Sequence, residues 1–231
     1  MRSPADILLQ PLERQRLWYW EDIPVLELRL SLPHCLSQDR RVCRINRYYE
    51  HFAKSCEQYA DRVLYPTAAE SFAAALQEHR CGEPWQFCVE FSTRLLSDKI
   101  WSLTVETAES TNRPPYRCRY ADTWDLNHGC PLSLSELFPV KSLHRRLRQH
   151  TREVLSARQA QGAVLRENWR QQLGSAWNRE NFYLSGEGLH WFYPMYTLGG
   201  ETLGIPEFFL PRDYSLLPLS LLVYGLSSDI R

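Results

Sequence analysis

The chain has 231 residues, of which 44% are hydrophobic and 13% aromatic, and this composition favours a packed globular protein over a disordered one. Its 27 basic and 27 acidic residues cancel, so no overall electric field would draw the chain to nucleic acid. No segment reaches the roughly 18 consecutive apolar residues that a membrane-spanning helix needs.

Seven cysteines are present, and neither their odd number nor their spacing fits a fully disulfide-bonded scaffold or a zinc site. We therefore expect reduced thiols, although Cys88 and Cys118 lie in strand-like segments and could pair. Arg14 and Arg16 interrupt the stretch where a signal peptide would be apolar. The expected location is cytoplasmic if Met1 is the native start, and extracellular if it is not.

The first half of the chain predicts one strand and two helices. Leucines alternate with polar residues at the end of residues 17–32, which predicts a half-buried strand. Apolar residues then recur at three- and four-residue steps over residues 39–65, and Pro66 should end this helix. A capping box at Thr67–Glu70 starts a second helix, which Gly82 should end.

The middle of the chain predicts a meander followed by helices. Apolar and polar residues alternate over residues 85–91, 101–105 and 116–126, with turn residues between them, as expected for an antiparallel sheet with one face in solvent. Ser133–Glu136 has the spacing of a second capping box. A long amphipathic helix is predicted over residues 141–158.

The last part of the chain predicts a helix and an aromatic hairpin. Residues 165–179 have helical spacing of their apolar positions. Residues 182–184 should pair with residues 189–193 across the turn at 185–188. A final strand is expected at residues 207–210, and this ribbon should lie in the same layer as the meander.

These elements predict an α+β fold, an antiparallel β-sheet with helices packed on one side. We expect a single domain over residues 1–231. Within it, residues 17–82 form a strand–helix–helix half, and residues 83–216 form a half with the meander, the long helix and the aromatic hairpin.

Three segments of the sequence resemble one known family. They run from Phe182 to Phe208, from Trp124 to Phe138, and from Ile23 to Tyr49. Their pattern is similar to the RsiV-like domain of unknown function, which occurs at the C-terminus of the anti-sigma-V factor RsiV and in the peptidoglycan deacetylase PdaC. The chain departs from the family at Arg113–Cys118, where members usually carry a Gly-Gly-Ala-His element.

The resemblance implies a non-catalytic recognition or sensor-type module whose ligand is unknown. It implies a protein or a cell-wall fragment as partner, and neither a cofactor nor an enzymatic activity. The membrane span of RsiV and the catalytic domain of PdaC have no counterpart in this sequence.

Two groups of residues are candidates for binding. Trp191, Tyr193 and Tyr196 could line a sugar- or peptide-binding cleft, or form the core of a small sheet. Arg145, Arg148 and Arg152 share one face of the long helix and could bind a phosphate or an acidic partner, or simply face solvent.

Two other functions stay open. The chain could be a small hydrolase or transferase built around Asp122 with His128 or His190, brought together by the fold. It could also be an intracellular structural or assembly protein that docks through the apolar segment 216–226. The seven histidines show no metal-binding spacing, so we predict no metal site.

Overall fold

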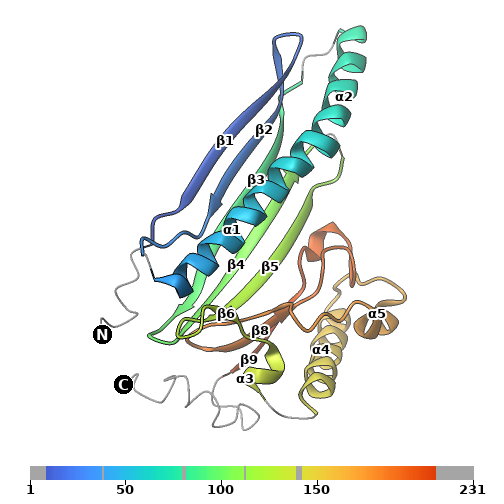
Figure 1. Cartoon of the computed structure of the whole chain (residues 1–231). Helices are drawn as coiled ribbons and strands as arrows, with labels where there is room; N and C mark the ends of the chain where they lie inside the picture. The colour runs from blue at the N-terminus through green and yellow to red at the C-terminus, as the bar shows by residue number, and fades with distance from the viewer. Residues whose placement is uncertain (1–8, 38, 80–81, 112, 139–141, 212–231) are drawn as a thin grey trace. The chain divides into compact units, whose positions relative to one another are not determined.

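The computed structural model describes residues 9–37, 39–79, 82–111, 113–138 and 142–211 (Figure 1). It has the α+β composition that the sequence predicts. The chain divides into two compact units, neither of them continuous in sequence. One takes in Ile7–Phe91 and Val105–Arg117, and the other takes in Ser92–Thr104 and the chain from Cys118 onward. The three central strands therefore pass through both units.

The first unit opens with a hairpin of strands β1 (Leu12–Trp20) and β2 (Ile23–Leu32), which pair antiparallel. Glu21 and Asp22 form the turn with φ of 46° and 69°, the left-handed conformation that a two-residue hairpin requires. The sequence predicts one strand within residues 17–32, so the structure adds β1. Five of its nine residues are exposed and its polar residues run consecutively from Glu13 to Arg16, so alternation of apolar residues does not reveal it.

Strands β2 and β3 (Trp85–Leu96) pair in parallel, so the sheet is mixed, whereas the sequence predicts an antiparallel sheet. The reason is the connection between them, because helices α1 (Arg40–Tyr59) and α2 (Tyr65–Gln77) carry the chain back before β3 begins. Both helices lie along the strands that they join (Figure 1).

The prediction that Pro66 ends the first helix was wrong. A five-residue π-helical turn, Ala60–Leu64, joins α1 directly to α2. Tyr65 N–H bonds to the Ala60 carbonyl, five residues back, and Pro66 sits in the first turn of α2, where a missing N–H is tolerated. The Thr67 hydroxyl donates to the Val63 carbonyl, so Thr67 does not cap a helix.

The predicted meander is present. Strands β3, β4 (Ile100–Ser110), β5 (Tyr116–Asp125) and β6 (Cys130–Pro131) follow one another in the sheet. The turn between β3 and β4 is closed by a hydrogen bond of 2.9 Å from Ser97 N to the Ile100 carbonyl. Such a short connection makes this pair antiparallel.

The second unit contains helices α3 (Leu134–Leu137), α4 (Leu143–Ala160) and α5 (Trp169–Ser175), which is shorter than the predicted helix at 165–179. Strands β7 (Phe182–Leu184), β8 (Gly188–Phe192) and β9 (Glu207–Pro211) form an antiparallel sheet of their own. The hairpin prediction is confirmed, but the ribbon does not join the meander sheet.

One hydrophobic cluster holds the second unit together. It packs the inner faces of α4 and α5 against the three-stranded sheet, with Ile100 of β4 included. Buried aromatic rings supply much of its area, among them Trp169, Trp191 and Phe208.

Replacing Ser133 with alanine is expected to lower the free energy of unfolding by about 1 kcal/mol. The capping box predicted at Ser133–Glu136 is present: Ser133 Oγ accepts from Glu136 N–H, and Glu136 Oε2 accepts from Ser133 N–H at 2.7 Å. Urea titration measures the loss. Ser92→Ala, at an exposed position on β3, is the control, and an equal loss in both variants would contradict the capping role.

Candidate functional site

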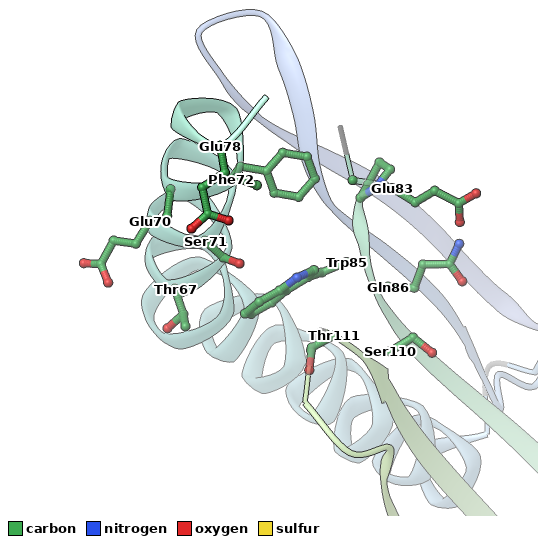
Figure 2. Close-up of a pocket in the computed structure, with 14 residues that line it drawn as sticks. Thr67, Glu70, Ser71, Phe72, Glu78, Glu83, Trp85, Gln86, Ser110 and Thr111 are labelled. Atoms are coloured by element: carbon green, nitrogen blue, oxygen red, sulfur yellow. The ribbon is translucent and has the colours of Figure 1, made fainter. Parts of the chain in front are cut away.

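A groove of about 940 Å³ lies in the first unit, between helix α2 and the beginning of strand β3 (Figure 2). The floor of the groove is aromatic. Phe72 on α2 is 6% exposed and Trp85 at the start of β3 is 7% exposed, so both rings are largely buried while they line the groove. Trp85 is placed by its register in the parallel pair, opposite Leu26 of β2.

The rim of the groove is acidic. Glu70 and Glu78 come from α2, and Glu83 comes from the segment just before β3. Hydroxyl groups complete the lining, from Thr67 and Ser71 on α2, from Ser110 at the end of β4 and from Thr111 after it. Among the described residues that line the groove, none is lysine, arginine or histidine.

The three carboxylates do not converge on one point. Figure 2 shows the Glu70 and Glu83 side chains pointing in opposite directions, outward from the space between helix and strand in which Trp85 lies. Carboxylates that are spread around an aromatic floor attract several separated positive charges better than a single ion. In the described part of the chain, no three histidine, cysteine, aspartate or glutamate side chains gather as metal ligands.

The aromatic residues predicted to bind lie elsewhere, in the second unit. Trp191 and Tyr193 are 1% and 0% exposed, and both belong to the hydrophobic cluster. The Trp191 indole N–H donates to Thr151 Oγ1 at 2.9 Å, and the Tyr193 hydroxyl donates to the Leu173 carbonyl at 3.2 Å. Tyr196 is partly buried, in a left-handed conformation with φ of 63°. Trp191 and Tyr193 thus serve as core residues and line no accessible cleft.

The three predicted arginines are exposed on α4 but do not share one pocket. Arg145 lines a groove of about 490 Å³ with Arg146, His150 and Leu210. The guanidinium of Arg148 instead lies close to Gly174 of α5. Arg152 is exposed on the same helix.

The structure pairs both candidate histidines with carboxylates other than Asp122. His128 Nδ1 lies 2.8 Å from Asp125 Oδ2, and His190 Nδ1 lies 3.1 Å from Glu207 Oε1. Asp122 itself is partly buried on β5. Glu207 was not predicted as a functional residue, because the groups around it come from distant parts of the sequence.

Glu207 is the centre of a polar network in the second unit. Its carboxylate accepts hydrogen bonds from the Tyr183 hydroxyl at 2.6 Å, from His190 and from the Arg119 guanidinium. Burial opposes ionisation of Glu207, but these hydrogen bonds and the Arg119 charge outweigh it and lower its pKa to about 2. Burial and the bond to Glu207 raise the pKa of the Tyr183 hydroxyl.

Three further predictions from the sequence concern parts of the chain other than these sites. Cys88 and Cys118 both carry free thiols, so the pairing considered for them is not formed. No helix that the structure describes is long and apolar enough to span a membrane. The apolar segment 216–226, considered as a docking element, lies outside the described residues.

No family model matches the sequence, and no curated protein matches it significantly. Solved structures do match the fold. A DUF3298 family member from Bacteroides fragilis superimposes with a TM-score of 0.69 and 13% identity, over 99% of this chain and all of that chain. A DUF3298 family protein from Pseudomonas aeruginosa PAO1 gives a TM-score of 0.59 and 14% identity, over 91% of this chain and 93% of the other. The chain therefore has the fold seen in DUF3298 family proteins.

Proposed function

We propose that this chain is a recognition module of the RsiV-like kind, and that it binds its partner without chemical change through the acidic groove beside α2. The fold shared with DUF3298 family proteins and the RsiV-like sequence motifs both support a module of this type. The main observation that supports the proposal is the groove itself. Carboxylates surround its aromatic floor, although the net charge of the whole chain is zero.

The partner is a protein segment that carries several lysine or arginine residues. A guanidinium group can stack on the face of an aromatic ring and pair with a neighbouring carboxylate at the same time. Because Glu70, Glu78 and Glu83 stand apart, such a segment must present its charges at intervals along an extended chain. A cell-wall fragment is the alternative partner, and its sugar rings would contact the Trp85 ring rather than the carboxylates.

Neutralising the rim tests this proposal. The variant with Glu70, Glu78 and Glu83 all changed to glutamine is expected to bind a fluorescent arginine-rich peptide about 10- to 100-fold more weakly, at roughly 0.5–1 kcal/mol for each exposed pair. Fluorescence anisotropy at low salt measures the affinity. Binding to the wild type should also weaken as salt is added, because exposed charges are screened.

A matched control separates the groove from net charge. Glu167, Glu180 and Glu201 are exposed in the second unit, and changing them to glutamine alters the net charge by the same amount. This control variant should bind the peptide like the wild type. Equal weakening of both variants, or no binding of the peptide by the wild type, contradicts a cationic partner. Binding of soluble muropeptides that is unaffected by the rim variant would favour the cell-wall alternative.

A further inference from the structure

Ser185, His190 and Glu207 form a continuous hydrogen-bonded series across the three-stranded sheet of the second unit. Ser185 follows β7, His190 lies on β8, and Glu207 begins β9. Ser185 Oγ lies 2.9 Å from His190 Nε2, and His190 Nδ1 lies 3.1 Å from Glu207 Oε1. A hydroxyl, an imidazole and a carboxylate linked in this order and at these distances are the arrangement that activates a serine for nucleophilic attack.

The histidine is held in place from both sides. Its ring stacks on Tyr183 with a centroid distance of 4.5 Å and an interplanar angle of 7°. Phe209 covers the ring from a centroid distance of 4.7 Å. The imidazole therefore keeps both of its nitrogens aimed at their partners, which reduces the reorganisation that proton transfer would need.

Glu207 sets the tautomer of the histidine. Arg119 and Tyr183 both bond to this carboxylate, so it remains ionised and acts as an acceptor. Nδ1 of His190 must then carry a hydrogen, which leaves the lone pair of Nε2 to accept the Ser185 hydroxyl proton. In this arrangement Glu207 is a positioning residue.

The Ser185 side chain is accessible, and its oxygen accepts hydrogen bonds from the backbone. Ser185 is partly exposed, and Gly186 and Glu187 beside it are exposed. The backbone N–H groups of Glu187 and Gly188 donate to Ser185 Oγ at 3.2 and 3.3 Å. Hydrogen bonds from two amides to this oxygen favour the deprotonated form of the hydroxyl.

We infer that Ser185 is an activated nucleophile that attacks carboxylic esters, with His190 as general base and Glu207 as its positioning residue. Oγ forms a bond to the ester carbonyl carbon while its proton passes to His190 Nε2. The carbon–oxygen bond to the alcohol then breaks, and the alcohol leaves with that proton. Water attacks the acyl-serine by the same route, releases the acid and restores the hydroxyl, so the net reaction is ester plus water to acid plus alcohol.

This inference goes beyond the proposed recognition function and revises the expectation that the chain has no catalytic set. The sequence showed no orienting group for His190, and the structure supplies Glu207 from 17 residues away. The series lies in the second unit and the acidic groove in the first, so the two proposals fail or succeed independently.

A fluorophosphonate probe tests the reactivity of Ser185 directly. Incubation of the folded wild-type chain should give one adduct by intact mass, and peptide mapping should place it on Ser185. Ser185→Ala should give no adduct, and His190→Gln should lower the labelling rate by about 100-fold or more. Glu207→Gln should also slow labelling, and should change its pH profile. An acetyl ester such as p-nitrophenyl acetate should release its alcohol in a burst that the same variants lose.

Several outcomes would overturn the inference. One is a folded wild-type chain that stays unlabelled at Ser185, and another is equal labelling of Ser185 and of Ser175, an exposed serine on α5. If His190→Gln does not fold, the pH profile of the wild type decides. If Ser185 is activated, its labelling rate reaches a plateau at the pH where the histidine is neutral. If the labelling rate instead rises in proportion to the hydroxide concentration, the hydrogen bonds of Ser185 only stabilise the turn.

Discussion

Replacing Glu207 with glutamine is expected to lower the free energy of unfolding at pH 7 by about 2 to 3 kcal/mol. The pKa of Glu207 falls from 4.5 to about 2 in the folded chain, and each unit corresponds to about 1.36 kcal/mol. The side chain is 32% exposed, which places the expected value at the lower end of this range. Glutamine keeps the size of the side chain but replaces one of its two acceptor oxygens with an NH2 donor, so it removes the charge and at least one of the accepted hydrogen bonds.

The same variant predicts a pH dependence. A carboxylate whose pKa is lowered by folding stabilises the folded state fully above the unfolded value, here 4.5, and this contribution is lost as the pH falls toward about 2. The difference in stability between wild type and Glu207→Gln should therefore be largest above pH 4.5 and shrink toward zero near pH 2. Urea titrations at a series of pH values measure this difference.

The effect arises from the hydrogen bonds that His190 and Tyr183 donate to Glu207 and from the charge of the Arg119 guanidinium. The Arg119 side chain is 13% exposed, so neutralising Glu207 removes a charge-assisted hydrogen bond from a largely buried guanidinium. Glu187→Gln is the control, because Glu187 is exposed in the adjacent turn. A difference between wild type and Glu207→Gln that is the same at pH 3 and pH 7 would contradict the account.

The elements that the sequence predicted best are those whose signals are local. Its glycines and the flanking aromatic residues predict the hairpin around Ser185–Gly188. The capping box at Ser133 and Glu136 is fixed by two side chains three residues apart. In both cases the physical cause lies within one short segment, so a single sequence suffices to find it.

The elements that the sequence missed depend on distant partners. Strand β1 carries arginines that pair with helix residues, Arg14 with Glu57 and Arg16 with Asp61. Its stability comes from these partners and from β2, and its own apolar pattern is weak. The parallel pairing of β2 and β3 likewise follows from the helices between them, which the alternation within a strand does not encode.

The candidate sites could not be predicted from the sequence either, because their residues also come from distant segments. The groove takes its carboxylates from α2 and from the segment before β3, and its aromatic floor looks like ordinary core in the sequence. The residues around Glu207 come from β5, β7 and β8, up to 88 residues away. Only the fold brings these groups within hydrogen-bonding distance.

Replacing Trp191 with alanine is expected to lower the free energy of unfolding by about 3 to 5 kcal/mol, the usual range for a fully buried tryptophan. The ring is 1% exposed, stacks on Phe208 at a centroid distance of 5.9 Å and contacts His150. Alanine would leave a large cavity between α4 and the three-stranded sheet, and would remove the hydrogen bond to Thr151. Thermal and urea unfolding measure the loss.

This experiment separates a core residue from a binding residue. A ligand-contacting tryptophan could be removed with little effect on folding, whereas Trp191→Ala should unfold at much lower urea concentration whether or not a partner is present. Trp191→Phe, which keeps a ring in the cavity, should lose less stability than Trp191→Ala. Tyr19, which is 52% exposed, provides the surface control, and Tyr19→Ala should change stability by about 0.5 kcal/mol or less. A Trp191→Ala chain as stable as the wild type would mean that the aromatic cluster is not what joins α4 to the sheet.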